Sequence, residues 1–270
     1  MNILAFDTCF DACSVAVLRA DGEVATERVL IRRGHAEALV PMIGRTMGAA
    51  MMAFDELDRI AVTHGPGSFT GTRVGMAAAI GFAFAHDLPV VTYSSLLCIA
   101  RAGIERLATR RNNYDGIVVV RDAKRGSVYI EIADMKGREI VPASLKSISE
   151  ARALISASAR QTSPGADPPG APVQKHYFGM GTGISLLLAG ADGAGLPGLR
   201  SDWPAVGEQG DTTTPDDMDN PDARYMLQDT ALREPATPPR PLYLRPPDAA
   251  PSSVPPLARL QALAPGEPNV

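Results

Sequence analysis

Two aspartates near the ends of apolar runs are the first candidates for chemistry in this chain of 270 residues. Asp7, followed by Thr8, ends the run Ile3–Phe6, and Asp122 closely follows the run Ile117–Val120. A carboxylate at such a turn can hold the water shell of a metal ion, and neighbouring backbone amides can bind phosphate. Asp7, Thr8 and Asp122 therefore predict a nucleotide cleft. The alternative is that each aspartate hydrogen-bonds within its own turn.

The segment Gly65–Gly71 (Gly-Pro-Gly-Ser-Phe-Thr-Gly) is the most distinctive local pattern. Its glycines allow unusual backbone angles, Pro66 stiffens the turn, and Thr70 or Thr72 can cap a following helix. Such a loop can hold an anion at a helix N-terminus. It lacks the Gly-Lys-Ser/Thr ending of a P-loop, however, so we interpret it as a structural loop and helix cap.

Other kinds of chemistry have little support in the sequence. The four histidines are scattered without metal-ligand spacing, and Ser68 lies in no nucleophile elbow. We therefore predict no catalytic residue and no metal site. A net charge of −4 is unfavourable for holding nucleic acid by charge alone. Three cysteines without a disulfide framework, and a start unlike a signal peptide, indicate a cytoplasmic protein without a membrane role.

The elements that would position these residues form two similar halves. The first half predicts three strands and then helix, strand, helix, strand, helix, with the helices at 35–52, 72–86 and 94–107. After residue 115 the order strand, turn, strand, turn, strand repeats. This repeat predicts an α/β protein of the actin-like, RNase H-like (ASKHA) fold, with two lobes that each open with a three-stranded meander.

The domain limits follow from changes in composition. We place a first lobe at residues 1–110, completed by a short helix at about 221–234, and a second, degenerate lobe at 111–220. Proline, glycine and small residues at 161–175 and 190–219 predict mobile loops in that second lobe. Residues 235–270 are a proline-rich tail.

The first two predicted helices carry an unusual amount of apolar surface. Residues 74–85 are apolar all round, and a helix without a polar face is expected to be buried on every side. The first helix adds methionines, whose flexible side chains suit a binding surface. The pair therefore predicts a docking surface, with an ordinary internal helix pair as the alternative.

Several motifs resemble the TsaB (YeaZ) family. The most specific is Gly65–Gly75, and it is joined by Ile3–Thr8, His35–Ile43, Asp122–Tyr129 and the C-terminal Pro241–Arg245. The match is strong to about residue 145 and patchy from there to the C-terminal motif.

The resemblance implies a non-catalytic dimerisation subunit that binds the catalytic paralogue TsaD directly and works with the ATPase TsaE. That complex transfers threonylcarbamoyl from its adenylate to N6 of adenosine 37 in tRNAs reading codons that begin with A. ATP and a metal ion are then used by the partners, and this chain has no cofactor. Pairing is expected through the first two helices, at His35, Glu37, Leu39, Met42, Ile43, Met47, Arg73, Met76 and Ile80.

Two other readings stay open on the sequence. One is a stand-alone ATP-dependent hydrolase or phosphotransferase of the same fold, with Asp7 and Asp122 on magnesium. The other is a homodimer that uses the same helix surface when TsaD is absent.

Overall fold

Two five-stranded sheets, each with helices, make up the computed structural model, which describes residues 1–108, 113–162, 172–189, 196–200 and 219–245. The elements around the first sheet, in chain order, are β1 (Ile3–Asp7), β2 (Ala12–Leu18), β3 (Val24–Leu30), α1 (His35–Ala49), η1 (Phe54–Glu56), β4 (Arg59–Gly65), α2 (Phe69–His86), β5 (Val90–Ser94) and α3 (Ser95–Ala108). Those of the second half are β6 (Gly116–Asp122), β7 (Ser127–Asp134), β8 (Glu139–Ser147), α4 (Ile148–Ala159), β9 (Arg160–Thr162), β10 (Pro172–Gln174), β11 (Tyr177–Met180), α5 (Ile184–Leu188) and β12 (Leu199–Arg200).

The two sheets have the same topology. The first runs β3-β2-β1-β4-β5 and the second β8-β7-β6-β11-β12. In each, three antiparallel strands form a meander, and the next two strands pair in parallel beside the first strand of that meander. The duplicated order confirms the predicted actin-like fold with two similar lobes.

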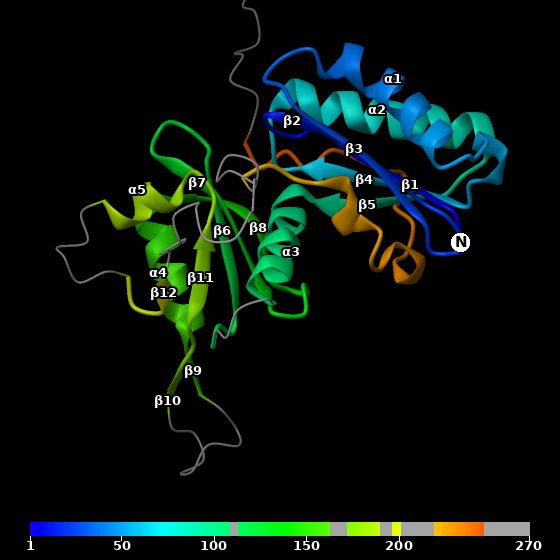
Figure 1. Ribbon diagram of the computed structural model, residues 1–270. Coiled ribbons are helices and arrows are strands. Elements are labelled where there is room, and N and C mark those ends of the chain that lie inside the picture. The colour runs from blue at the N-terminus through cyan, green and yellow to red at the C-terminus, as the bar shows by residue number, and fades with distance from the viewer. Residues whose placement is uncertain (109–112, 163–171, 190–195, 201–218, 246–270) are drawn as a thin grey trace, which may run out of the picture.

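The helices form layers outside and between the sheets (Figure 1). On one side, α1 and α2 cover the first sheet and bury a core that includes Phe6, Ile43 and Met76. On the other side, α4 and α5 cover the second sheet. Between the two sheets lies α3, whose Leu96 and Ile99 pack among residues of β6 and β11. The lobes are therefore joined through a shared helix layer.

The C-terminal segment returns to the first sheet as two short 3₁₀ turns, η2 (Ala223–Met226) and η3 (Thr230–Leu232). This corrects the single helix predicted to end near residue 233. The Asp229 carboxylate between the turns accepts two hydrogen bonds from the Arg101 guanidinium, at 2.8 and 2.9 Å, and one from the Tyr93 hydroxyl. Asp229 therefore lies between two short turns rather than within one continuous helix, and side chains distant in the sequence hold it there.

The predicted loop at 161–175 is partly a hairpin. Strand β9 pairs antiparallel with β10, whereas residues 163–171 lie outside the described residues. Most of the predicted loop at 190–219 and the tail beyond residue 245 also lie outside them. Helix α4 went unpredicted, although Ser147 and Glu150 form a capping box that marks its start.

Leu242, within the C-terminal motif, donates its backbone N–H to the His64 carbonyl, so this part of the tail is attached to the end of β4. No helix within the described ranges is both long and apolar enough to cross a bilayer.

Replacing Asp229 by alanine is expected to destabilise the fold. The Arg101 side chain is only 6% exposed, and without Asp229 its charge would lack a carboxylate partner. Removing one member of a buried pair costs about 3 kcal/mol of unfolding free energy. Urea unfolding of D229A measures the loss.

The control for D229A is Arg138→Ala, which breaks the more exposed pair with Asp134. Exposed ion pairs contribute at most about 1 kcal/mol. Equal losses in D229A and R138A would contradict the role assigned to the Arg101–Asp229 pair.

Candidate functional site

Asp7 lies fully buried at the end of β1. Its Oδ1 accepts hydrogen bonds from the Cys9 backbone N–H at 3.2 Å and from the Thr63 hydroxyl at 2.5 Å. Its Oδ2 has no hydrogen-bond partner among the residues that the structure describes. Burial raises the pKa of Asp7 from 3.8 to about 6, although these hydrogen bonds oppose the shift.

The glycine-rich loop closes over this turn. The Thr8 hydroxyl donates to the Gly71 carbonyl at 2.6 Å, and a Cβ at Gly71 would lie 2.0 Å from the Thr8 carbonyl oxygen. Ser68 caps α2 by accepting the Gly71 N–H, so the predicted caps Thr70 and Thr72 are corrected. The reason is that α2 begins at Phe69, earlier than predicted. The loop is a structural loop and cap, as interpreted from its sequence.

Asp122 is held within its own turn. It accepts the Lys124 backbone N–H and the Lys124 ammonium, each at 2.7 Å. The hydrogen bond from the Lys124 side chain lowers the pKa of Asp122. Of the two interpretations considered for Asp122, the structure therefore shows hydrogen bonding within its own turn.

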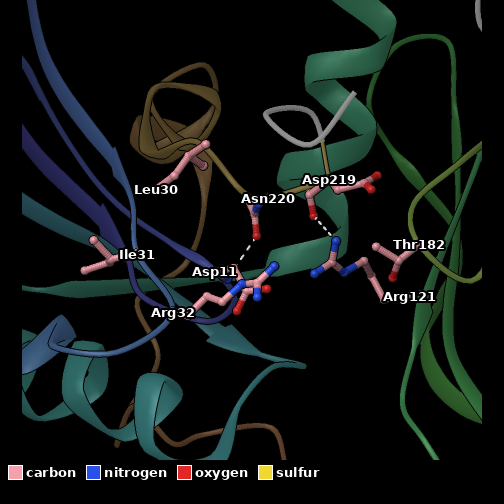
Figure 2. A pocket seen from close by; sticks show the side chains of 8 residues that line it. All are labelled: Asp11, Leu30, Ile31, Arg32, Arg121, Thr182, Asp219 and Asn220. Atoms are coloured by element: carbon pink, nitrogen blue, oxygen red, sulfur yellow. Dashed lines mark hydrogen bonds between the residues drawn. The ribbon is translucent and has the colours of Figure 1, made fainter. Parts of the chain in front are cut away.

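A cavity of about 300 Å³ opens between the lobes (Figure 2). Its lining residues are Asp11, Leu30, Ile31, Arg32, Arg121, Thr182, Asp219 and Asn220. Asp7, Thr8 and Asp122 do not line it, because the start of α2 covers the first two and Lys124 engages the third. This cavity therefore does not hold the three predicted cleft residues. Arg121 was not among the predicted site residues, because it directly follows the apolar run Ile117–Val120 and belongs to no recognised motif.

The structure buries most of the residues that were predicted for a partner interface. Six of its nine side chains are buried inside this chain because they lie on the sheet-facing sides of α1 and α2: His35, Leu39, Met42, Ile43, Met47 and Met76. A partner docking on the folded chain cannot contact them directly. The exposed members are Glu37, Arg73 and Ile80.

The solvent-facing side of the two helices is apolar and built largely of small residues. We call it the outer face and define it by Val40, Gly44, Gly48 and Met51 at α1, and by Ala77, Ile80, Gly81 and Phe84 on α2. Phe84 is 92% exposed and Ile80 46%. Within this chain α2 is therefore buried on its sheet-facing side and exposed on its other side. A Cβ added at any of the three glycines would meet no atom within 4 Å.

Arg73 has a local role at the start of α2. Its guanidinium lies 3.7 Å from the centre of the Phe69 ring, and its Nε donates to the Tyr243 hydroxyl at 2.7 Å. These contacts attach the C-terminal motif beside the outer face. Among the described residues, no group of three or more His, Cys, Asp or Glu side chains could hold a metal ion.

The duplicated sheets, the shared middle helix and the cavity between the lobes define a two-lobed α/β protein of the actin-like class. The chain belongs to the family described as TsaD: tRNA N6-adenosine threonylcarbamoyltransferase, whose model matches residues 29–180.

Curated relatives carry the name predicted from the motifs. The chain is 37% identical to the tRNA threonylcarbamoyladenosine biosynthesis protein TsaB of Haemophilus influenzae, over 48% of this chain and 52% of the relative. With TsaB of Escherichia coli it shares 35% identity over 48% of this chain and 53% of the relative. The chain thus spans about half the length of these curated relatives. The resemblance to TsaB is confirmed.

Solved structures agree on the fold. YeaZ from Pseudomonas aeruginosa matches with a TM-score of 0.64 at 24% identity, covering 90% of this chain and 99% of that one. A second Pseudomonas aeruginosa structure, described as an uncharacterized protein with similarity to peptidase YeaZ, matches with a TM-score of 0.63 at 25% identity and the same coverage.

Replacing Asp7 by asparagine is expected to remove a pH-dependent loss of stability. Because the folded pKa is raised, the folded state binds more protons than the unfolded state between about pH 4 and pH 6. The contribution of Asp7 to stability is therefore full below pH 4 and lost as the pH rises through 6. At pH 7, D7N should gain up to about 3 kcal/mol relative to the native chain, and this gain should vanish toward pH 4. Urea unfolding across this range measures it.

Asp122→Asn is the control for D7N, because the pKa of Asp122 is lowered rather than raised. Its effect should have the opposite sign, a loss at neutral pH that fades as the pH falls through the folded pKa. A stability difference for D7N that stays constant with pH would contradict the account of Asp7.

Proposed function

We propose that this chain is a non-catalytic subunit of the machinery that installs N6-threonylcarbamoyl on adenosine 37 of tRNAs reading codons that begin with A. In this proposal it binds the catalytic subunit TsaD directly and works beside the ATPase TsaE. Support comes from the family match and the relatives named TsaB.

The outer face is the observation that carries the proposal. Phe84, Ile80 and Val40 leave apolar side chains in water, although apolar surface is stabilised by burial. Gly44, Gly48 and Gly81 beside them allow another backbone to come close. A contiguous apolar patch of this kind is typical of a protein–protein contact. A helical surface of TsaD is the partner that we propose for it.

The contacts of the two aspartates support a non-catalytic role for this chain. Cys9 and Thr63 hold Asp7 inside the protein, and Lys124 engages Asp122, so we assign neither aspartate to magnesium. ATP and a metal ion belong to the partner subunits in this proposal, and this chain needs no cofactor. With a net charge of −4, the chain reaches tRNA through the complex rather than by its own charge.

The three cysteines are free and buried, as suits a cytoplasmic subunit in a reducing compartment.

When TsaD is absent, a second copy of the chain can cover the outer face. Light scattering with and without TsaD distinguishes that homodimer from the complex.

Ile80→Glu is expected to break the complex with TsaD. Ile80 is half-exposed, so the new carboxylate leaves the core intact but places a charge in the centre of the contact. Loss of a central interface residue weakens binding about 30-fold or more. Calorimetry with purified TsaD measures the affinity, and reconstituted tRNA modification should fall in parallel.

Val24→Glu is the matched control, since Val24 is 49% exposed on the edge strand β3, away from the outer face. It should bind TsaD like the native chain. If I80E binds TsaD as tightly as V24E does, the outer face is not the contact surface.

A further inference from the structure

The cavity between the lobes has contributions from both halves of the chain. Arg32 follows β3 in the first lobe, whereas Arg121 is the last residue but one of β6 and Thr182 follows β11 in the second. Figure 2 shows the two arginine side chains entering from opposite sides. The volume of about 300 Å³ is at the small end of ligand sites, which span about 300–1,000 Å³. It suits a small molecule.

Arg121 is the unusual residue of this cavity. Its side chain is only 6% exposed, and its guanidinium lies 4.4 Å from the centre of the Phe10 ring. Its NH1 donates to the backbone carbonyl of Asp219. In the part of the chain that the structure describes, Arg121 forms no ion pair. The stacked ring and the carbonyl together hold its planar group in place at the cavity wall.

A buried guanidinium without a carboxylate partner is costly, because burial penalises its charged form. Burial accordingly lowers the pKa of Arg121, while Asp219 and Asp11 act against that shift. A bound oxyanion would supply the missing partner, since the fork of a guanidinium matches carboxylate and phosphate oxygens in pairs.

The other lining groups define the rest of the ligand. Arg32 adds a second positive charge, and the Thr182 hydroxyl adds a donor. Asp11 and Asp219 are acidic members of the same wall, and the backbone N–H of Asp11 donates to the Asn220 side-chain oxygen at 2.9 Å. A carboxylate here attracts a hydroxyl or ammonium group and repels a chain of several phosphates.

We propose that the cavity between the lobes binds a small metabolite with a single oxyanion group, held by Arg121, Arg32 and Thr182, and with a hydrogen-bond donor facing Asp11. The oxyanion is a carboxylate or a phosphate, which share the same contacts with a guanidinium. The site lies apart from the outer face and makes no use of Asp7 or Asp122.

Calorimetric titration of the full chain tests the proposal, at constant ionic strength, with inorganic phosphate, acetate and glycine as separate probes. At least one probe should bind, and the one that binds best identifies the anion. Tighter binding of glycine than of acetate shows that an ammonium group faces Asp11. Arg121→Gln and Arg32→Gln should each weaken that probe about tenfold or more, since each removes a charge-assisted contact.

Arg33→Gln is the matched control, because Arg33 is exposed, adjacent to Arg32 and absent from the cavity wall. It should bind like the native chain. Circular dichroism checks folding of R121Q, and if that variant unfolds, R32Q decides the question. Absence of binding by all three probes up to tens of millimolar overturns the proposal. So does binding that R32Q leaves unchanged.

The two proposals are tested separately, each in the absence of the other ligand. I80E should bind the probe like the native chain, and R32Q should bind TsaD like the native chain. Failure of one proposal therefore leaves the other standing.

Discussion

Helix α3 is buried between the two sheets, and this burial determines how both lobes pack. Its apolar residues pack in two clusters, one with the second sheet and one with the first, so α3 covers the inner faces of both sheets. A polar group buried in this layer is costly unless it finds a partner inside the protein, and among the described residues Oε1 of Glu131 has none. Arg101 finds its partner in Asp229. The Ser94 hydroxyl donates to Glu131, and burial raises the pKa of Glu131 to about 8, which favours the neutral acid at pH 7.

The outer helix layer, formed by α1 and α2, is buried on one side only. One side of α1 and α2 covers the first sheet, and the other side is left apolar and in contact with solvent. Because Ile43 and Met76 are already committed to the core, the proposed contact with a partner falls to the outer face, where Val40, Ile80 and Phe84 are exposed. The helix pair therefore serves both the fold and the proposed assembly, with different residues for each.

Local pattern was enough to predict the fold, but it did not show which side of a helix is covered. The repeated order of strands and turns identified the duplicated lobes. Spacing of three and four placed Leu39, Met42 and Met47 on one side of α1, and the sheet rather than a partner covers that side. In α2 the sequence is apolar all round, so periodicity had no side to indicate. Contacts between residues far apart in the sequence could not be predicted from local pattern either. Asp229, for example, binds Arg101, which lies 128 positions earlier in the chain.

The turn after β1 connects the cavity with the helix layer. Phe10 lies under the Arg121 guanidinium, and its backbone carbonyl is 2.8 Å from His35 Nε2 at the start of α1. Arg32, on the cavity wall, precedes α1 by three residues. An anion at Arg121 and a partner on α1 would therefore act on the same short stretch of backbone. Any effect of one on the affinity of the other must be reciprocal and of equal size, because both affinities belong to one thermodynamic cycle.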